Sequence, residues 1–555
     1  MTGFSPLGWC GLALLALAGC GAPATPVPAP AAKPPAPIDQ LSRIVEGYWD
    51  EHKPTEHAIS PQFLADSLSI ERRYLTQLAD LPRDQLDASS RLTYDIFRRR
   101  REIAIEGFTF PDELLPVDPF DGMPQRFAAR AGQLAHDAAT AAAYADFLRD
   151  IDDYVRWTQQ AIANMRQGIR RGYTSPRTVV ERMLPILERL GVDDSANPFY
   201  ALLRSMPDSI KAAERPRLTK DMTSAIVDKL LPANRALHEF LQKEYLPRAR
   251  AGLAFSELPL GSQWYAYRIK RTIGTPLSAD EINRIGVAEV ERLGSPPAHE
   301  GAPAPANGLL NAYTDLEVQV HAALPTLFSE LPKSNFEIRS SEWLPLPATA
   351  LYYQPGGPNG VPPAVVFVSA GKAARPLSIA GFLQAGLPGR HLQIALQRER
   401  TDLPRFRRFG AEAAFTEGWG LYAVSLGEAL GLYPDEPAKS DATAAEMRCA
   451  VALVVDTGLH AKGWTRGQAF DYLRTHLGVD DPDAQSLIDW YATNPAEAMA
   501  CMMGGMKFRA LRAHAQQLLG GRFDLREFHH EILKDGAMPP DILEAKMKAW
   551  MDASK

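Results

Sequence analysis

The sequence lacks the motifs of the common hydrolase and cofactor sites. It has no His-Glu-x-x-His zinc motif and no Gly-x-Ser-x-Gly nucleophile elbow. The nearest serine pattern, Ser369-Ala-Gly371, lacks the first glycine of an elbow. Gly-Gly pairs at 356–357, 504–505 and 520–521 stand outside any phosphate-loop context. We therefore find no support for serine hydrolysis and no cofactor site in the sequence.

The chain also lacks a strong charge of either sign. Its 60 basic and 66 acidic residues give a formal net charge of -6, which does not favour nucleic-acid binding. The basic run from Arg98 to Arg101 lies within a helical pattern, and we interpret it as a solvated helix face. We expect no nucleic-acid partner.

Cysteine is scarce, with four residues in 555 and no Cys-x-x-Cys spacing that would indicate a zinc site. Cys10 and Cys20 lie in the first twenty residues, which leaves Cys449 and Cys501 for the folded part. These two could pair in an oxidising compartment. From the sequence alone we expect two buried free thiols instead.

The first apolar segment is too short to span a bilayer. Leu12 to Leu17 are apolar, and the segment ends in Leu-Ala-Gly-Cys20. This pattern resembles a bacterial lipoprotein signal, in which residues 1–19 are removed and Cys20 carries the lipid. By the same resemblance, Gly21 favours the outer membrane. We expect a periplasmic protein that contacts the membrane through its N-terminal lipid, with the Pro/Ala-rich residues 20–38 as an extended tether.

Residues 39–555 are predicted to form one mainly α-helical unit. Apolar residues at three- and four-residue spacing predict helices at 61–80, 140–171, 178–190, 221–245, 280–293, 441–460 and 540–552. Three short segments with strand composition predict a small β-sheet: Phe336–Ser340, Ala350–Tyr353 and Ala364–Val368.

The stretch that follows these strands carries the strongest motif of the chain. It reads LPGRHLQ at residues 387–393, and EGWGLY follows at 417–422. Residues 39–552 resemble the bacterial domain of unknown function 885, whose members typically show HExxPGHHLQ and then EGWALYAE. Further blocks support the resemblance, including VDTGLH at 455–460 and FDLREFH at 523–529. The resemblance implies a large two-lobed helical fold like that of zinc metallopeptidases, with the small sheet near the active-site cleft.

The residues that would hold zinc in this family are mostly replaced. The first family histidine falls on Gln384, its adjacent glutamate on Ala385, and the second histidine on Arg390. An amide is a poor zinc ligand, alanine cannot accept a proton, and a fixed guanidinium charge would repel the metal. A family tyrosine that could stabilise an oxyanion falls on Cys501. The resemblance keeps only Glu417, the third ligand, and His391.

We predict that Arg390 replaces the metal electrostatically by pairing with Glu417, because a buried carboxylate without a partner is costly. Further candidates to line the cleft are His391 and the pair Asp456 and His460. The four-residue spacing of that pair places both on one helix face. If a metal is bound after all, the remaining candidate ligands are His391, Glu417 and His460.

The sequence therefore favours a lipid-anchored pseudopeptidase, which binds a peptide or an envelope protein in its cleft without catalysis and without a cofactor. Two alternatives stay open. One is an active metallopeptidase with a non-standard metal site. The other is a structural envelope lipoprotein with no ligand.

Overall fold

The computed structural model describes residues 36–52, 59–136, 140–204, 206–207, 210–294, 306–341, 351–357, 360–369 and 377–555. The expected signal peptide, Cys20 and nearly all of the tether lie outside the described residues. The first helix, α1, begins at Pro37, which occupies the first helical turn where its missing N–H costs nothing.

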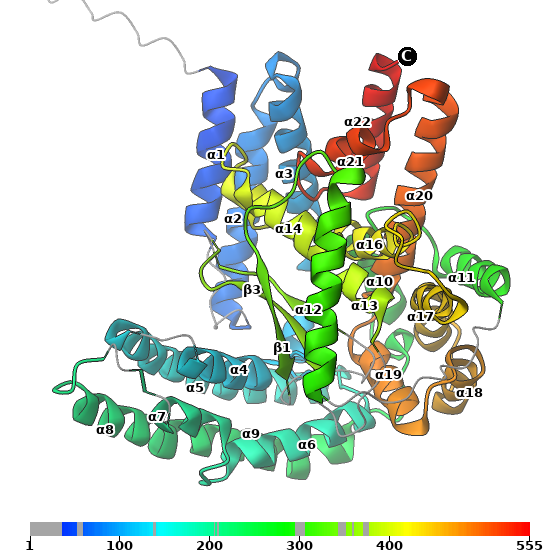
Figure 1. The fold of residues 1–555 in the computed structure, drawn as a ribbon. Coiled ribbons are helices and arrows are strands. Elements are labelled where there is room, and N and C mark those ends of the chain that lie inside the picture. The colour runs from blue at the N-terminus through cyan, green and yellow to red at the C-terminus, as the bar shows by residue number, and fades with distance from the viewer. Residues whose placement is uncertain are drawn as a thin grey trace, which may run out of the picture.

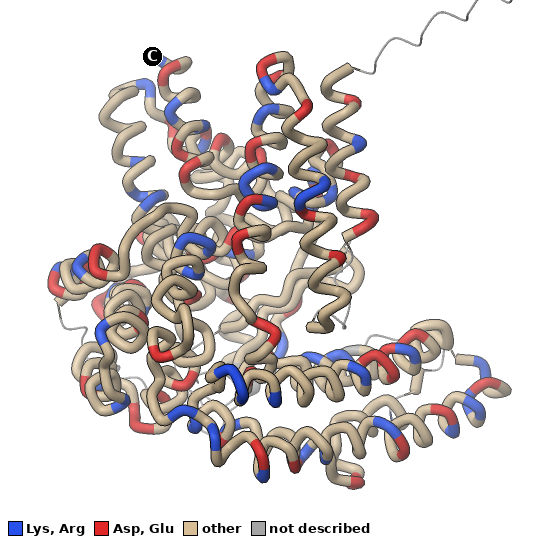
Figure 2. The backbone as a smooth tube through the Cα atoms, turned by 180° about the vertical axis from the view of Figure 1, so that it is seen from behind, with Lys and Arg blue, Asp and Glu red and all other residues tan. Residues whose placement is uncertain are grey.

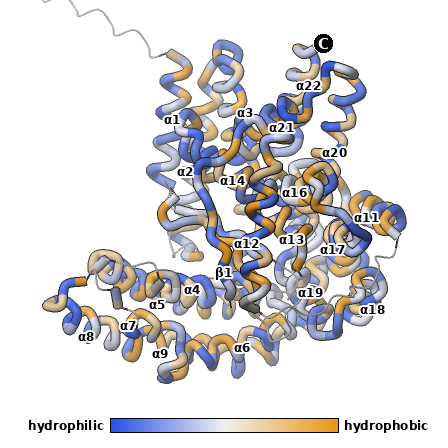
Figure 3. The backbone as a smooth tube through the Cα atoms, in the orientation of Figure 1, coloured by the Kyte–Doolittle hydropathy of each residue, from blue (hydrophilic) through white to orange (hydrophobic). Residues whose placement is uncertain are grey.

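One group of helices forms a separate layer, seen along the bottom of Figure 1. It packs around a core that includes Phe127, Tyr154 and Leu187. Hydrophobic and hydrophilic residues alternate along its tubes in Figure 3, as amphipathic helices require. The layer consists of α4 (Met123–His136), α5 (Ala141–Arg171), α6 (Arg177–Gly191), α7 (Ala201–Arg204), α8 (Arg215–Ala225) and α9 (Leu231–Phe240).

A second core joins both ends of the chain to its middle, and it includes Phe97, Trp419 and Phe528. Figure 1 shows the blue N-terminal helices and the red C-terminal helices side by side above the α4–α9 layer. This body contains α1 (Pro37–Glu51), α2 (Pro61–Ala79), α3 (Ala88–Gly107), α12 (Ala306–Ala323), α13 (Ile379–Ala385), α14 (Arg390–Glu399), α15 (Arg405–Arg408), α16 (Ala413–Val424), α20 (Met499–Leu519), α21 (Leu525–Leu533) and α22 (Pro540–Ala553).

A third core surrounds α17, which is buried along most of its second half. The core includes Trp264, Val451 and Leu453. The start of α20 also packs here, so α20 connects this core to the second one. The other helices are α10 (Gly261–Ile273), α11 (Ala279–Leu293), α17 (Glu436–His460), α18 (Arg466–Leu477) and α19 (Asp481–Thr493).

The sheet has three strands in the order β1-β3-β2. β1 (Phe336–Ser341) pairs in parallel with β3 (Ala364–Ser369), and β2 (Tyr352–Gln354) pairs antiparallel to β3. Tyr352 faces Phe367 in that register. β2 is thus an edge strand, and the sheet immediately precedes α13 and α14 in the chain.

The predicted helices and the strands predicted at 336–340 and 364–368 are confirmed, with one difference in detail among the helices. The strand predicted at 350–353 is shifted: it spans Tyr352–Gln354, and Ala350 lies outside the described residues. Residues predicted as a single helix at 221–245 form the end of α8, a π-helical turn at Ile226–Leu230, α9, and a second π-helical turn at Leu241–Tyr245. Among the described helices, none is both long enough and apolar enough to cross a membrane.

The basic run on α3 is not the solvated face that the sequence suggested. Arg101 is only 7% exposed and forms a buried ion pair with Glu71, and Arg100 pairs with Glu412. These arginines connect α3 to other helices. Elsewhere in Figure 2 residues of both signs are interspersed along the helices, in keeping with the small net charge.

Candidate functional site

The family motif folds as two short helices separated by a turn. α13 ends at Ala385, Gly386–Gly389 form the turn, and α14 begins at Arg390. A Cβ atom on Gly389 would lie 2.2 Å from the carbonyl oxygen of Gln384, so only glycine fits this close approach. The indole of Trp419 on α16 donates a hydrogen bond to the Pro388 carbonyl oxygen at 2.9 Å. This bond fixes the turn against α16 and so places the start of α14 beside that helix.

The expected ion pair between Arg390 and Glu417 is present. The Arg390 side chain is 19% exposed and that of Glu417 is 35% exposed, so the pair lies at a partly solvated position. Among the described residues, Arg390 Nε is buried and has no hydrogen-bond partner. The pair therefore uses only part of the guanidinium's donor capacity.

Tyr352 lies close enough to this pair to sense both of its charges. Partial burial raises the pKa of its phenol above the ordinary value, and Asp121, which precedes α4, adds to the rise. Arg390 lowers the same pKa and Glu417 raises it. The residue is nevertheless 43% exposed on the edge strand β2. The structure thus adds the sheet edge to the surroundings of the ion pair.

Gln384 lies directly against the helix that carries Glu417. A Cβ on Gly420 would approach Gln384 Cγ to 3.0 Å and Arg390 Cγ to 3.7 Å. The glycine therefore lets α16 contact both side chains. The Gln384 amide nitrogen donates to Cys501 Sγ at 3.7 Å. We call Tyr352, Gln384, Arg390, Glu417 and Cys501 together the Arg390 site.

Cys501 and Cys449 form a disulfide between α20 and α17, with a Cα–Cα distance of 5.7 Å. The expectation of two free thiols is therefore wrong. Cys501 is at the first turn of α20, which also packs tightly on α16: a Cβ on Gly418 would lie 2.4 Å from the backbone of Gly504. Such contact leaves no room for a side chain between the two helices.

The side chain of His391 lies in the core. It is 1% exposed and lies against the aromatic ring of Phe336 on β1. Its Nδ1 accepts a hydrogen bond from the Tyr353 hydroxyl at 3.2 Å, and its Nε2 donates to the Ser334 carbonyl at 3.0 Å. Burial lowers the pKa of His391 to about 4. The structure thus gives it a core position and not the cleft-lining position that we expected.

Asp456 and His460 share one face of α17 as predicted, but that face is fully buried. His460 Nδ1 accepts from the Phe255 amide at 3.1 Å, and its Nε2 donates to the Tyr491 carbonyl at 2.9 Å. Burial lowers the pKa of His460 to about 3. The prediction that His460 lines an open pocket is corrected, because both of its ring nitrogens bond within the core.

Asp456 accepts hydrogen bonds from the Tyr265 hydroxyl at 2.5 Å and from the Ala496 amide at 3.0 and 3.1 Å. Burial raises the pKa of this carboxyl to about 7. Ala496 has a positive φ of 71° and precedes α20 by a few residues. Asp456 therefore anchors the loop that leads into α20, and it is not a group on an open surface.

These contacts do not provide a ligand set for zinc. In the described part of the chain, no group of three or more His, Cys, Asp or Glu side chains is placed to hold a metal ion. Glu417 is neutralised by a cation, Cys501 is oxidised, and Gln384 directs its amide nitrogen, a donor, toward the sulfur. Zinc needs electron-pair donors in tetrahedral array, which the Arg390 site does not offer.

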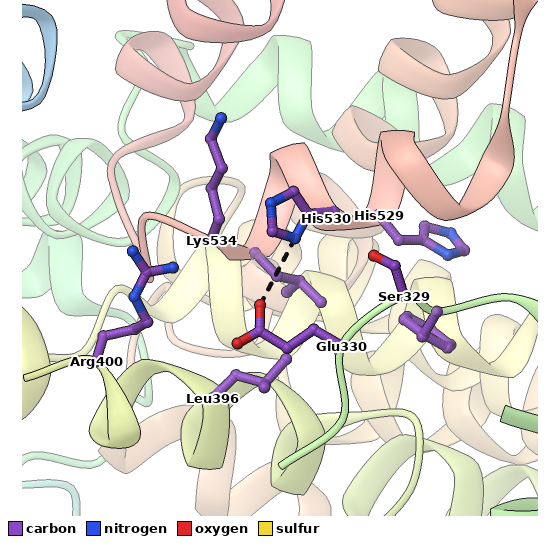
Figure 4. A pocket seen from close by; sticks show the side chains of 9 residues that line it. Ser329, Glu330, Leu396, Arg400, His529, His530 and Lys534 are labelled. Carbon is purple, nitrogen blue, oxygen red and sulfur yellow. Dashed lines mark ion pairs between the residues drawn. The ribbon is translucent and has the colours of Figure 1, made fainter. Parts of the chain in front are cut away.

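A small hollow between α14 and α21 contains two adjacent histidines (Figure 4). Its volume of about 10 Å³ has room for one water molecule. His530 points toward Glu330 at 3.6 Å, whereas His529 points away from it and bonds to the Tyr422 hydroxyl at 2.8 Å. The two imidazoles diverge because adjacent residues on a helix point about 100° apart.

The sequence comparison establishes the family. Residues 46–296 and 295–547 match the family described as "Bacterial protein of unknown function (DUF885)", so the chain belongs to it. The resemblance inferred from the motifs is confirmed. No curated protein matches the chain.

Solved structures with the same fold also exist. A protein from Colwellia psychrerythraea, assigned as a lipoprotein, is 22% identical with a TM-score of 0.80, and 93% of this chain and 96% of that one are covered. A protein from Shewanella oneidensis, assigned as a lipoprotein of unknown function, is 14% identical with a TM-score of 0.62. The match covers 92% of this chain and 98% of that one. An M32 carboxypeptidase from Deinococcus radiodurans R1 is 11% identical and covers 93% and 97%, but its TM-score of 0.36 is below that of a shared fold.

Sequence reasoning missed Tyr352 and the glycine contacts of α16. Tyr352 could have been found only from the sheet order, because it is 38 residues from Arg390 in the chain and lies on a three-residue strand. The glycines carried a visible signal. Gly418, Gly420 and Gly504-Gly505 interrupt helical segments, where glycine is unfavourable unless backbones approach closely.

Proposed function

We propose that this protein is a catalytically inactive relative of helical zinc metallopeptidases. It binds a peptide, or an extended segment of an envelope protein, at the Arg390 site and does not cleave it. The observation that carries the proposal is the ion pair between Arg390 and Glu417. It occupies the positions of two family metal ligands and leaves no base beside them, since Ala385 replaces the glutamate that would activate water.

The environment of the pair supports binding of a main-chain amide. Both side chains are partly exposed, 19% for Arg390 and 35% for Glu417, so the guanidinium and the carboxylate together offer a donor and an acceptor to one ligand. An amide group presents the complementary acceptor and donor. Tyr352 adds an exposed aromatic surface on the sheet edge.

The proposal places the protein in the periplasm, held at the outer membrane by a lipid on Cys20. The Leu-Ala-Gly-Cys20 sequence supports this position. The disulfide between Cys449 and Cys501 is in keeping with it, because disulfides persist in oxidising compartments.

The test is to incubate the full chain with fluorescently labelled tryptic peptides of casein, with and without added zinc. We expect saturable binding by fluorescence anisotropy and recovery of every peptide intact by mass spectrometry. Arg390→Ala and Tyr352→Ala should weaken the binding, whereas Lys548→Ala on the exposed face of α22 is the matched control. Zinc-dependent cleavage would establish an active peptidase instead.

The two alternatives lead to different outcomes. A metal site built from His391, Glu417 and His460 has no support in the geometry, because both histidines have both ring nitrogens engaged in the core. Binding that is absent for all peptides, under conditions where the chain is folded, would favour a structural envelope component.

A further inference from the structure

The disulfide lies within the Arg390 site and is unequally exposed. Cys449 is in the middle of α17 and only 8% exposed, whereas Cys501 is half-buried at the start of α20. A thiolate from solvent can therefore reach Cys501 more easily than Cys449. Exposed disulfides are the ones open to exchange.

The disulfide is connected to the ion pair through direct contacts. Cys501 Sγ accepts from the Gln384 amide, and Gln384 packs on Gly420, one helical turn from Glu417 on α16. On the other side, α20 and α16 meet backbone to backbone at Gly504 and Gly418. Because no side chain separates the two helices there, movement near the start of α20 reaches α16 through direct backbone contact.

The start of α20 is also attached to α17 by contacts other than the disulfide, since Met499 and Met502 pack in the core around α17. The carboxylate of Asp456 accepts from the Ala496 amide, in the loop before α20. Without the disulfide this attachment remains, so α20 would stay in place while its first turn, at Cys501, gains freedom. The expected change is therefore local to the Arg390 site and is not global unfolding.

We propose that the Cys449–Cys501 disulfide is a redox-controlled latch of the Arg390 site. A dithiol reductant attacks Cys501 Sγ as its thiolate, the S–S bond breaks, and Cys449 leaves as a thiolate that takes up a proton. The second thiol of the reductant then attacks the mixed disulfide and releases Cys501. The dithiol becomes a disulfide, two electrons pass to this protein, and α16 with Glu417 is loosened.

Hydrogen exchange with mass spectrometry tests the latch without any peptide ligand, so its outcome is independent of the proposed function. The oxidised full chain is compared with the chain treated with dithiothreitol. We expect several-fold faster amide exchange in α16 and in the first two turns of α20 after reduction. Exchange in α5, which belongs to another core, is the internal control.

Two further measurements sharpen the test. The double variant Cys449→Ser/Cys501→Ser should show the faster exchange with or without dithiothreitol. After complete reduction by excess dithiothreitol, when both thiols are free, brief iodoacetamide treatment of the native chain should label Cys501 before Cys449, because Cys501 is the more exposed of the two. The proposal is overturned if native thiol titration finds both cysteines free, if reduction requires denaturant, or if α16 and α20 exchange equally in both states.

Discussion

The Arg390 site and the Asp456–His460 pair use similar residues in different ways. Each combines an acidic residue with a nitrogen-bearing side chain on helices. Arg390 and Glu417 are partly exposed and leave donor capacity unused. Asp456 and His460 are fully buried, and the core satisfies both His460 nitrogens. Under the proposed function the first pair belongs to a ligand site and the second is a structural requirement of the fold, and the two differ in how completely their hydrogen bonds are satisfied.

The largest effect is expected at the buried pair. His460→Ala removes the imidazole that bonds to both the Phe255 amide and the Tyr491 carbonyl, and it leaves a cavity in the core. We expect a loss of about 3–5 kcal/mol in the free energy of unfolding, measured by urea denaturation. His460→Gln, which can supply a donor and an acceptor, should recover part of the loss. A loss below about 1 kcal/mol for His460→Ala would contradict the structural assignment.

Asp456 should make the free energy of unfolding depend on pH. Its folded pKa of about 7 is above the ordinary 3.8, so the unfolded chain ionises first as the pH rises. Its contribution to stability is present below pH 4, is lost between pH 4 and 7, and is constant above, amounting to about 4 kcal/mol at most. The Asp456→Asn variant has no carboxyl group to ionise, so it should not lose this stability between pH 4 and 7.

Urea denaturation of wild type and Asp456→Asn at matched pH values measures the effect. The difference in unfolding free energy should shift in favour of Asp456→Asn from pH 4 to pH 7 and then level off. Comparing the two chains cancels the opposite trend of the buried histidines, whose neutral forms stabilise the fold at higher pH. A difference that does not vary with pH would show that Asp456 is ionised in the fold throughout.

A smaller effect is expected at the Arg390 site. Arg390→Ala should cost about 1–2 kcal/mol, less than for a buried pair, because Glu417 keeps contact with solvent. In a double-mutant cycle with Glu417→Gln, the coupling should be about 1 kcal/mol or less. A coupling as large as that of fully buried pairs would erase the proposed distinction between the two regions.

The sequence predicted more of the fold than of the site's surroundings. Amphipathic spacing located most helices, because a helix with one apolar stripe shows its period directly. α17 is different: residues 449–455 are apolar on all sides, which is typical of a fully buried helix. The spacing argument did not use this signal, which would have placed Asp456 and His460, at the end of the helix, inside the core.

Other features depend on distant contacts that one sequence does not specify. Cys449 and Cys501 are 52 residues apart, and their pairing depends on how α17 and α20 pack. The Arg390–Glu417 pair is predictable from the sequence only through the family resemblance, which places both residues at one metal position. Tyr352 required knowledge of the strand order. Helical periodicity is visible in neighbouring residues of the sequence. Contacts between residues far apart in the chain follow instead from the packing of whole helices and strands.

The metal content of the full chain, purified without chelator and then exposed to zinc, tests the central claim most directly. We expect inductively coupled plasma mass spectrometry to find far less than one zinc per chain after removal of free metal. This follows because the guanidinium of Arg390 holds the carboxylate that a metal would need. One tightly bound zinc per chain, lost together with a peptidase activity on chelation, would contradict the account.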